Sequence, residues 1–237
     1  MQKEYRKWRS PSLGKDMEML IFGDSGAPVV AFPTSTGNYL EWEENGLIDI
    51  LAEQIHLGYN QIFCVDSVMN KSLINKEIAP ENRLTTQLQY ECYILEEVLP
   101  FIKENNEHFY IMSAGIELGA YHSLLFALKH PEEFNKTICI SGDYDIRKYL
   151  DEYYDDTVYY NNPVDFIPNL NDPNILNQIE NLDIRLVSYS SDPYRETTER
   201  MSQTLWMKMI EHRLDIWDLN TPGKLELWGE MLKTHII

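Results

Sequence analysis

Cysteine, basic charge and long apolar runs are all scarce in this sequence of 237 residues. Its three cysteines, Cys64, Cys92 and Cys139, include no C-x-x-C pair. This argues against a disulfide framework, and we expect reduced, buried thiols of a cytoplasmic protein. Only 20 Lys and Arg face 38 Asp and Glu, which gives a formal net charge of -18. Such a surface repels phosphate backbones and anionic lipid, so neither nucleic acid nor membrane is expected as a partner.

The sequence also lacks several functional signals. No apolar stretch approaches the ~20 residues that span a bilayer, and residues 1–8 contain no apolar core of a signal peptide. Both absences favour a cytoplasmic location. No histidine pair has zinc-ligand spacing on one helix, and the acidic run at 151–156 lacks the spacing of a calcium loop. We therefore expect no metal and no other cofactor.

Apolar segments of strand and helix length alternate along the chain. The expected strands are residues 5–8, 17–23, 28–32, 61–65, 109–112, 137–140, 184–189 and 214–219, and the expected helices are 43–56, 81–99, 118–129, 194–211 and 225–235. Pro100 is expected to end or kink the second helix. With 43% apolar residues, this pattern predicts one α/β domain over residues 1–237. It should have a mostly parallel sheet of about eight strands, helices on both faces and an antiparallel N-terminal hairpin.

The stretch from Phe109 to His122 is the most informative part of the sequence. It reads as an apolar strand, a sharp glycine turn and a helix that begins at Leu118. The turn, Gly115-Ile-Glu-Leu-Gly119, has the spacing of the nucleophile elbow G-x-S-x-G, in which the glycines permit close approach of strand and helix. Glu117 stands where the serine would be, and neither Ser113 nor Ser123 is at the tip.

Serine hydrolysis also needs an acid and a histidine, which follow the serine in this chain order. Asp192 follows the strand expected at 184–189 and suits the acid, although a helix N-cap or an Asp-Pro turn explains it equally well. The loop 220–227, where the histidine should lie, contains none. His122 is near the elbow and could contribute to ligand binding, but we expect a helix-face residue rather than a base.

Several segments together carry a resemblance that spans nearly the whole chain. They are residues 10–17, 30–37, 63–67, 90–91, 97–100, 119–122, 127–131, 141–145 and 215–217, with Trp228 and Met231 near the end. In these segments the chain resembles the putative-esterase family of α/β-hydrolases, in its esterase D and mycolyltransferase-like branch. The resemblance implies the α/β-hydrolase fold and places the family's catalytic serine at Glu117. The family's histidine would fall at Gly223 or Lys224, where it is absent.

The resemblance also implies an oxyanion hole. It would use the backbone amide of Leu118 and one more from the loop that contains Thr34, Ser35 and Thr36. Backbone donors survive substitution, but an anionic Glu117 could itself occupy the hole. Glu117 could equally be stabilised by the N-terminus of the following helix.

Two functions follow from these features. The first is a catalytically inactive esterase homologue that binds a small molecule or a protein partner through the retained pocket. The alternative is a hydrolase acting on a carboxylic ester or a related substrate, with Glu117 as carboxylate nucleophile or general base. Residues 151–162, rich in tyrosine and acid, form either a lid or stacking surface for a ligand or an ordered excursion with packed rings. The sequence leaves the ligand and any self-association into homo-oligomers open.

Overall fold

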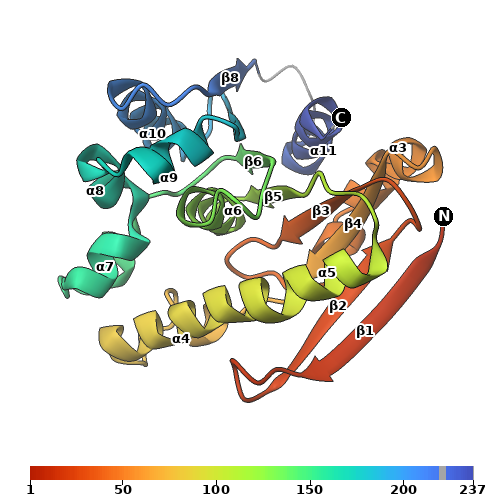
Figure 1. The fold of residues 1–237 in the computed structure, drawn as a ribbon, viewed down its shortest axis with the longest axis horizontal. Helices are drawn as coiled ribbons and strands as arrows, with labels where there is room; N and C mark the ends of the chain where they lie inside the picture. Colours follow the sequence, from red (N-terminus) through yellow and green to blue (C-terminus); the bar gives the residue numbers. More distant parts are fainter. Residues whose placement is uncertain (219–222, 237) are drawn as a thin grey trace.

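A computed structural model describes residues 1–218 and 223–236, and within them the chain forms an eight-stranded sheet (Figure 1). The strand order is β1-β2-β4-β3-β5-β6-β7-β8. The strands are β1 (Lys3–Arg9), β2 (Asp16–Phe22), β3 (Ala27–Phe32), β4 (Asn60–Val65), β5 (Met112–Ile116), β6 (Lys136–Ile140), β7 (Asp183–Tyr189) and β8 (Arg213–Trp217). The pairs β1–β2 and β2–β4 are antiparallel and the others are parallel. The predicted mostly parallel sheet with an N-terminal hairpin is thus confirmed.

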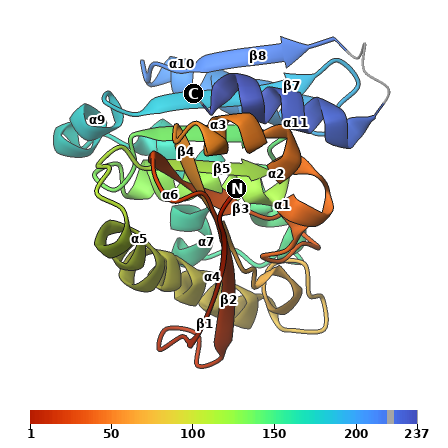
Figure 2. The same ribbon diagram turned by 90° about the vertical axis from the view of Figure 1, so that its right-hand side faces the viewer.

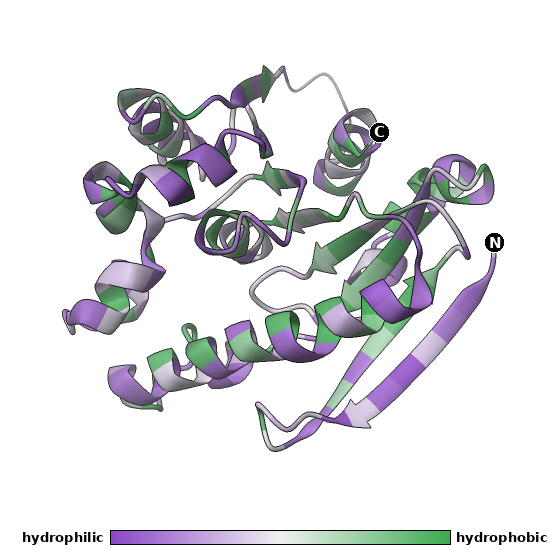
Figure 3. Cartoon of the chain, in the orientation of Figure 1, coloured by the Kyte–Doolittle hydropathy of each residue, from purple (hydrophilic) through white to green (hydrophobic). Residues whose placement is uncertain are grey.

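Helices cover both faces of the sheet, as Figure 2 shows in side view. One apolar cluster packs α4 (Pro80–Tyr93), α6 (Leu118–Lys129) and α10 (Arg195–Met207) on one face. The other cluster packs α1 (Glu41–Glu44), α2 (Leu47–Ile50), α3 (Ala52–His56) and α11 (Lys224–His235) on the opposite face. The central strands β3, β4, β5 and β6 are buried along their whole length and mostly apolar, whereas β1 is largely hydrophilic (Figure 3). Burial on both faces explains their apolar character.

Several expected elements differ from the structure, among them the strand before the elbow and the first expected helix. The strand before the elbow is β5, residues 112–116, and not residues 109–112; Phe109 is 85% exposed. The strand was misplaced because its true residues include the small Ser113, Ala114 and Gly115, which contribute little to an apolar pattern. The helix expected at 43–56 is three short helices, because Gly46 adopts a left-handed conformation with φ 72° between the first two.

Pro100 is expected to end or kink the long helix, and an end at this residue is wrong, because the helix continues beyond it. It passes from α4 through a π-helical turn, η2 (Ile94–Val98), into α5 (Leu99–Asn105). Pro100 lies in the first turn of α5. A first-turn N–H is not needed for the helical hydrogen-bond pattern, so proline is tolerated there. The π-helical turn before it is a common form of irregularity within α-helices.

The segment between β6 and β7 is an excursion of short helices. They are η3 (Ile146–Tyr149), α7 (Asp156–Asn161), α8 (Pro163–Phe166), η4 (Ile167–Asn169) and α9 (Pro173–Ile179). Its tyrosines bond acids of the same segment: Tyr153 donates to Asp155 at 2.6 Å and Tyr154 to Asp165 at 3.0 Å. These contacts favour the ordered excursion over the stacking surface.

The remaining expectations concern thiols and membranes. Cys64 and Cys139 are buried in β4 and β6, but Cys92 is exposed on α4, so its expected burial is wrong. In the part of the chain that the structure describes, no helix has both the length and the apolar character needed to cross a bilayer.

Candidate functional site

Glu117 stands at the tip of a tight turn between β5 and α6. Its backbone has φ 55° and ψ -115°, a region that residues other than glycine rarely adopt. A side chain on Gly115 would collide with the backbone of Gly119, and one on Gly119 with that of Pro33. The G-x-E-x-G spacing therefore corresponds to a strained strand–turn–helix in which both glycines are required by close backbone approach.

The Glu117 carboxylate is paired with an ammonium group from the end of the chain. Lys224, the first residue of α11, donates from Nζ to Glu117 Oε1 at 2.7 Å. The same ammonium lies 4.2 Å from the centre of the Trp228 ring, one helical turn further on. The Lys224 side chain is 46% exposed and that of Glu117 only 16%. Lys224, one of the two positions expected for the family's histidine, thus contacts Glu117, the position expected for its serine.

Asp192, the expected acid, lies in the turn after β7 and is buried. Its Oδ2 accepts a hydrogen bond from Ser188 Oγ at 2.7 Å, and its Oδ1 accepts one from the Tyr194 amide at 2.9 Å. Both carboxylate oxygens therefore have partners close by in the chain, one at the end of β7 and one in the turn that follows it. This geometry fits the turn interpretation, while the role of Asp192 as a triad acid stays a prediction.

The loop after β3 holds the other expected oxyanion donors. Glu41 of α1 accepts hydrogen bonds from the Thr34 amide at 2.6 Å and from the Thr34 hydroxyl at 2.5 Å. One candidate amide is thus already bonded to a carboxylate. Ser35 and Thr36 line a cavity of about 470 Å³ at the carboxyl ends of β3 and β4. Leu118 opens α6, so its amide is among the donors that the helix itself leaves without an acceptor.

His122 is enclosed in the core rather than presented to the turn. It is 2% exposed, its Nε2 lies 3.0 Å from Gln87 Oε1, and its ring packs against Phe32, Tyr90 and Phe126. Burial lowers its pKa to about 3, so the imidazole is neutral at physiological pH. Its expected part in ligand binding stays a prediction, and its burial argues against contact with a ligand.

The two serines near the elbow are also buried. Ser113 Oγ donates to Thr137 Oγ1 at 3.0 Å, and Ser123 Oγ donates to Ser113 Oγ at 2.8 Å. Neither the Ser113 nor the Ser123 side chain has any exposed surface. Neither hydroxyl can reach a substrate, which leaves Glu117 as the side chain at the position of a nucleophile.

A fourth acid, not singled out from the sequence, lies beside the elbow. Asp143 follows β6, has no exposed surface and contacts the Glu117 carbonyl through its amide at 3.4 Å. Its Oδ2 accepts from the Tyr149 hydroxyl at 2.5 Å and pairs with the Lys148 ammonium at 2.6 Å. Lys148 in turn lies over the rings of Tyr149 and Tyr194. The sequence signal that could have identified Asp143 is the run Ser141-Gly-Asp143, which directly follows an expected strand.

The charges around the elbow are predominantly negative. Burial raises the pKa of Tyr194, and the nearby charges of Glu117, Asp143 and Asp192 raise it further. Burial and the charge of Glu117 likewise raise the pKa of Glu41, although the hydrogen bonds from Thr34 oppose this. Four carboxylates therefore surround the turn, against the two ammonium groups of Lys148 and Lys224.

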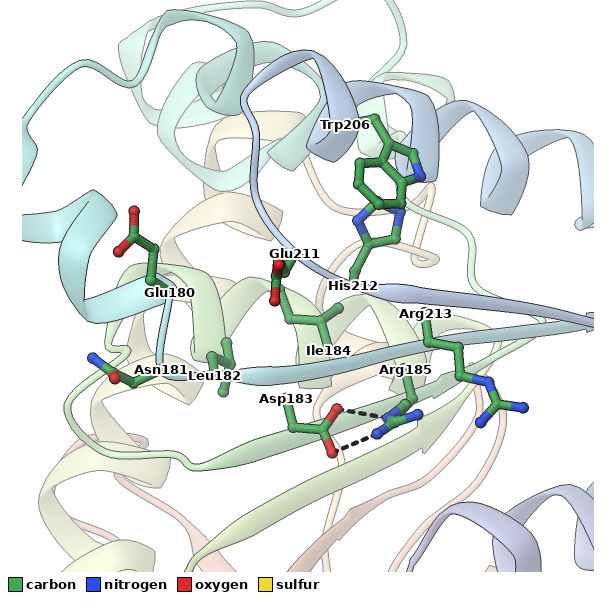
Figure 4. Close-up of a pocket in the computed structure, with 10 residues that line it drawn as sticks. All are labelled: Glu180, Asn181, Leu182, Asp183, Ile184, Arg185, Trp206, Glu211, His212 and Arg213. Carbon is green, nitrogen blue, oxygen red and sulfur yellow. Dashed lines mark hydrogen bonds and ion pairs between the residues drawn. The ribbon is translucent and has the colours of Figure 1, made fainter.

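A separate cavity of about 530 Å³ lies where β7 and β8 begin (Figure 4). It is lined by the first residues of β7 and β8, including Asp183, Arg185 and Arg213. Glu117 follows the carboxyl end of β5, and these strands are parallel, so the cavity is at the opposite end of the sheet. Within residues 1–218 and 223–236, no cluster of three or more His, Cys, Asp or Glu could hold a metal ion.

Comparison with protein families gives one match. The model of the family described as "Putative esterase" matches residues 66–226, which includes the elbow, Asp143 and Asp192. No curated protein matches the sequence.

Solved structures match over almost the full chain. A ferulic acid esterase has a TM-score of 0.78 at 14% identity, covering 98% of this chain and 95% of its own. An S-formylglutathione hydrolase from Agrobacterium tumefaciens has a TM-score of 0.75 at 13% identity, with 99% and 92% covered. MPT51 from Mycobacterium tuberculosis has a TM-score of 0.72 at 13% identity, with 99% and 96% covered. At these identities the likeness shows a common fold.

Proposed function

The chain belongs to the "Putative esterase" family, and from this membership we propose that it is a non-hydrolytic member that binds a small ligand at the elbow. The ion pair between Glu117 and Lys224 carries this proposal. In a serine hydrolase the tip residue attacks and a histidine accepts its proton. Here the tip is a carboxylate with no proton to give up. The group that faces it is an ammonium, which donates a hydrogen bond rather than accepting a proton.

The surroundings of Glu117 also oppose the serine mechanism. The Thr34 amide, a candidate oxyanion donor, is bonded to Glu41, and both oxygens of Asp192 are bonded to residues close by in the chain. An oxyanion forming at the tip would meet the charges of Glu117 and Glu41, with the Leu118 amide among the expected donors that remain. The loss of one triad member removes most of the catalytic rate, so the loss of a second adds little.

The charge distribution favours a neutral or cationic ligand. Four carboxylates lie around the turn, and the rings of Tyr149, Tyr194 and Trp228 flank its two ammonium groups. Aromatic faces bind apolar rings and cations, whereas an anionic ligand would be repelled. We therefore expect a small ligand with an aromatic, polyhydroxyl or amine group rather than a carboxylate or phosphate.

One observation favours the alternative, a hydrolase with Glu117 as nucleophile or general base. Glu117 keeps the strained elbow backbone, which costs roughly 1–3 kcal/mol and persists mainly where function requires it. A carboxylate nucleophile needs a base to activate water for release of the covalent ester. Among the described residues, no histidine is hydrogen-bonded to Glu117, which makes this the second candidate.

Hydrolysis of short-chain p-nitrophenyl esters tests the two candidates. Wild type, Glu117→Gln and Glu117→Ala are compared with buffer under identical conditions. We expect no turnover above buffer in any of them. Thermal-shift measurements on wild type with matched aromatic amines and aromatic carboxylates should show stabilisation by the amines alone.

Turnover by wild type that Glu117→Gln abolishes would establish the hydrolase and exclude the binding role. Turnover that both substitutions leave unchanged would point to a contaminating enzyme. Lys224→Met is the control for the ligand measurement. It removes the ammonium from Trp228 but not the carboxylate, so it should strengthen the binding of a cationic ligand.

A further inference from the structure

The two edges of the sheet differ in how they are protected against pairing. Five of the seven residues of β1 are charged, four of them positively. Charged edge residues, lysine above all, discourage pairing with another chain. Strand β8, at the other edge, has the sequence Arg-Leu-Asp-Ile-Trp, with one charge of each sign. Among the described residues, no strand pairs with its outer side.

Exposed apolar side chains gather next to β8. Trp206, Met207 and Met209 precede the strand and Leu214 lies within it, with exposures of 59%, 72%, 85% and 36%. The Trp206 ring contacts the His212 ring in a tilted arrangement on one side of the strand, with the ring centres 4.8 Å apart, while the guanidinium of Arg213 projects to the other side (Figure 4). His212 is fixed by Ser202 Oγ at 2.7 Å and by the Ile210 carbonyl at 2.9 Å. An apolar group of this kind beside an open strand marks an interaction surface.

The free backbone groups of β8 can be assigned to particular residues. The Trp217 carbonyl accepts a hydrogen bond from the Ser190 amide, so the backbone of Trp217 faces β7. Backbone groups alternate in direction along a strand. Those of Arg213 and Asp215 therefore also face β7. Those of Leu214 and Ile216 face the open edge.

We propose that β8 pairs antiparallel with β8 of a second copy of this chain, about a two-fold axis at Leu214. The sheet would then continue from one copy to the next. In this register Leu214 faces its own equivalent with hydrogen bonds between the two backbones. Arg213 of each copy lies opposite Asp215 of the other, on the same face, which gives two symmetric pairs of opposite charge.

Electrostatics selects this register from the alternatives. Only registers that place outward-facing residues opposite each other can form backbone hydrogen bonds. A two-fold axis at Asp215 satisfies this condition but sets two carboxylates directly against each other. An axis at Ile216 sets neither Arg213 nor Asp215 opposite a described residue of the other copy that carries the opposite charge. Within each copy Arg213 contacts Asp215 at 3.6 Å, and His235 Nε2 lies 3.2 Å from Asp215. The axis at Leu214 alone pairs both charges, and it brings the apolar groups of both copies to one side.

Variants in which one of the two charges is reversed test the pairing. Their self-association is measured by sedimentation velocity over a wide range of protein concentration. Wild type should form dimers. Arg213→Asp alone and Asp215→Arg alone each create two like-charge pairs and should raise the dissociation constant about tenfold or more. An equimolar mixture of these two variants should form a one-to-one heterodimer, because each chain then supplies the charge that the other needs.

Matched variants separate assembly from folding. Arg9→Asp makes the same change on β1 and should leave the dimer intact. Leu214→Lys places two ammonium groups at the two-fold axis and should weaken the dimer at an exposed position where folding is tolerant. Circular dichroism melting identifies any variant that fails to fold. A wild type that stays monomeric at every concentration would overturn the proposal, and so would single variants that weaken a dimer without rescue by mixing.

Discussion

The turn at residues 115–119 and the loops that face it are held together by different kinds of contact. The turn is fixed by backbone approach: glycine at positions 115 and 119 leaves no room for a Cβ. The facing loops are fixed by charge. Glu41 bonds Thr34, and Lys224 bonds Glu117. The first kind of contact admits almost no substitution, whereas the second admits many.

This difference explains how the chain can keep the fold of an esterase family while its side-chain chemistry changes. Steric constraints persist regardless of which group sits at the tip, since they arise from the packing of β5 against α6 and the loop after β3. The charged groups are partly solvated, and individual exposed pairs contribute only about 0–1 kcal/mol. A family can therefore exchange them at small cost in stability. The predictions below probe the turn and the loops separately.

The largest effect should come from filling the turn. Gly119→Val places side-chain carbon against the backbone of Pro33, which cannot move without displacing β3. We expect a loss of roughly 3 kcal/mol of unfolding free energy, or about 10 °C in melting temperature. Gly46→Ala is the control, because Gly46 has a positive φ, unlike Gly119, but open space around it. It should cost only about 1 kcal/mol, measured by the same thermal and urea denaturation.

The next effect concerns activity. If the turn still positions its tip residue as in a hydrolase, Glu117→Ser combined with Lys224→His should hydrolyse p-nitrophenyl acetate about tenfold or more above wild type, since a base next to a hydroxyl activates it. Glu117→Ser alone should gain less. Labelling of position 117 by a fluorophosphonate, read by mass spectrometry, provides an independent measurement. If the double variant shows neither hydrolysis nor labelling, the turn no longer presents a reactive group.

Sequence patterns identified the turn better than its surroundings. The G-x-E-x-G spacing placed Glu117 at the tip because glycine requirements are local. The strand before it was misplaced by about three residues, since the apolar run that ends at Met112 is more hydrophobic than the small residues that form β5. The fold class followed from the alternation of apolar segments, which reflects burial on both faces of the sheet.

The contacts between the turn and the loops were beyond sequence reasoning. Lys224 and Glu117 are 107 residues apart, and nothing local to either residue indicates the other. The resemblance implies Gly223 or Lys224 as the position of the family's histidine, but it does not indicate a contact between Lys224 and Glu117. Asp143 was overlooked because a buried acid after a strand resembles an ordinary turn residue. Glu41 gave no signal, since its bond to Thr34 depends on the path of the intervening loop.

A smaller effect on stability should follow from removing the backbone strain at Glu117. Glu117→Gly removes the positive-φ strain, worth roughly 1–3 kcal/mol, and also the ion pair with half-exposed Lys224, worth about 0–1 kcal/mol. The net expectation is a stabilisation of about 1 kcal/mol in urea denaturation. Glu117→Ala keeps the strain and loses the ion pair, so it should be neutral or slightly destabilised. Equal stability of the two variants would show that the backbone at the tip is not strained.

The smallest effect tests the loops through pH. Burial, opposed by the Thr34 hydrogen bonds and assisted by the charge of Glu117, raises the pKa of Glu41. The folded chain therefore binds this proton more tightly than the unfolded chain. Ionisation of Glu41 thus lowers stability as the pH rises above the ordinary glutamate pKa. Glu41→Gln removes this dependence but weakens the bonds to Thr34, so at neutral pH the two effects should nearly cancel, within about 0.5 kcal/mol.

The informative quantity is the pH dependence of the difference in unfolding free energy between Glu41→Gln and wild type. The free energy of unfolding of Glu41→Gln minus that of wild type should become more negative as the pH falls towards 4, because only wild type gains stability from protonation of this group. In a Glu117→Gln background this difference should vary less with pH, since the neighbouring charge that helps to raise the pKa of Glu41 is then absent. Urea denaturation of the four proteins of this double-mutant cycle measures the coupling directly. A pH dependence that is identical in both backgrounds would mean that the two carboxylates do not interact, and that the loop after β3 and the turn are electrostatically independent.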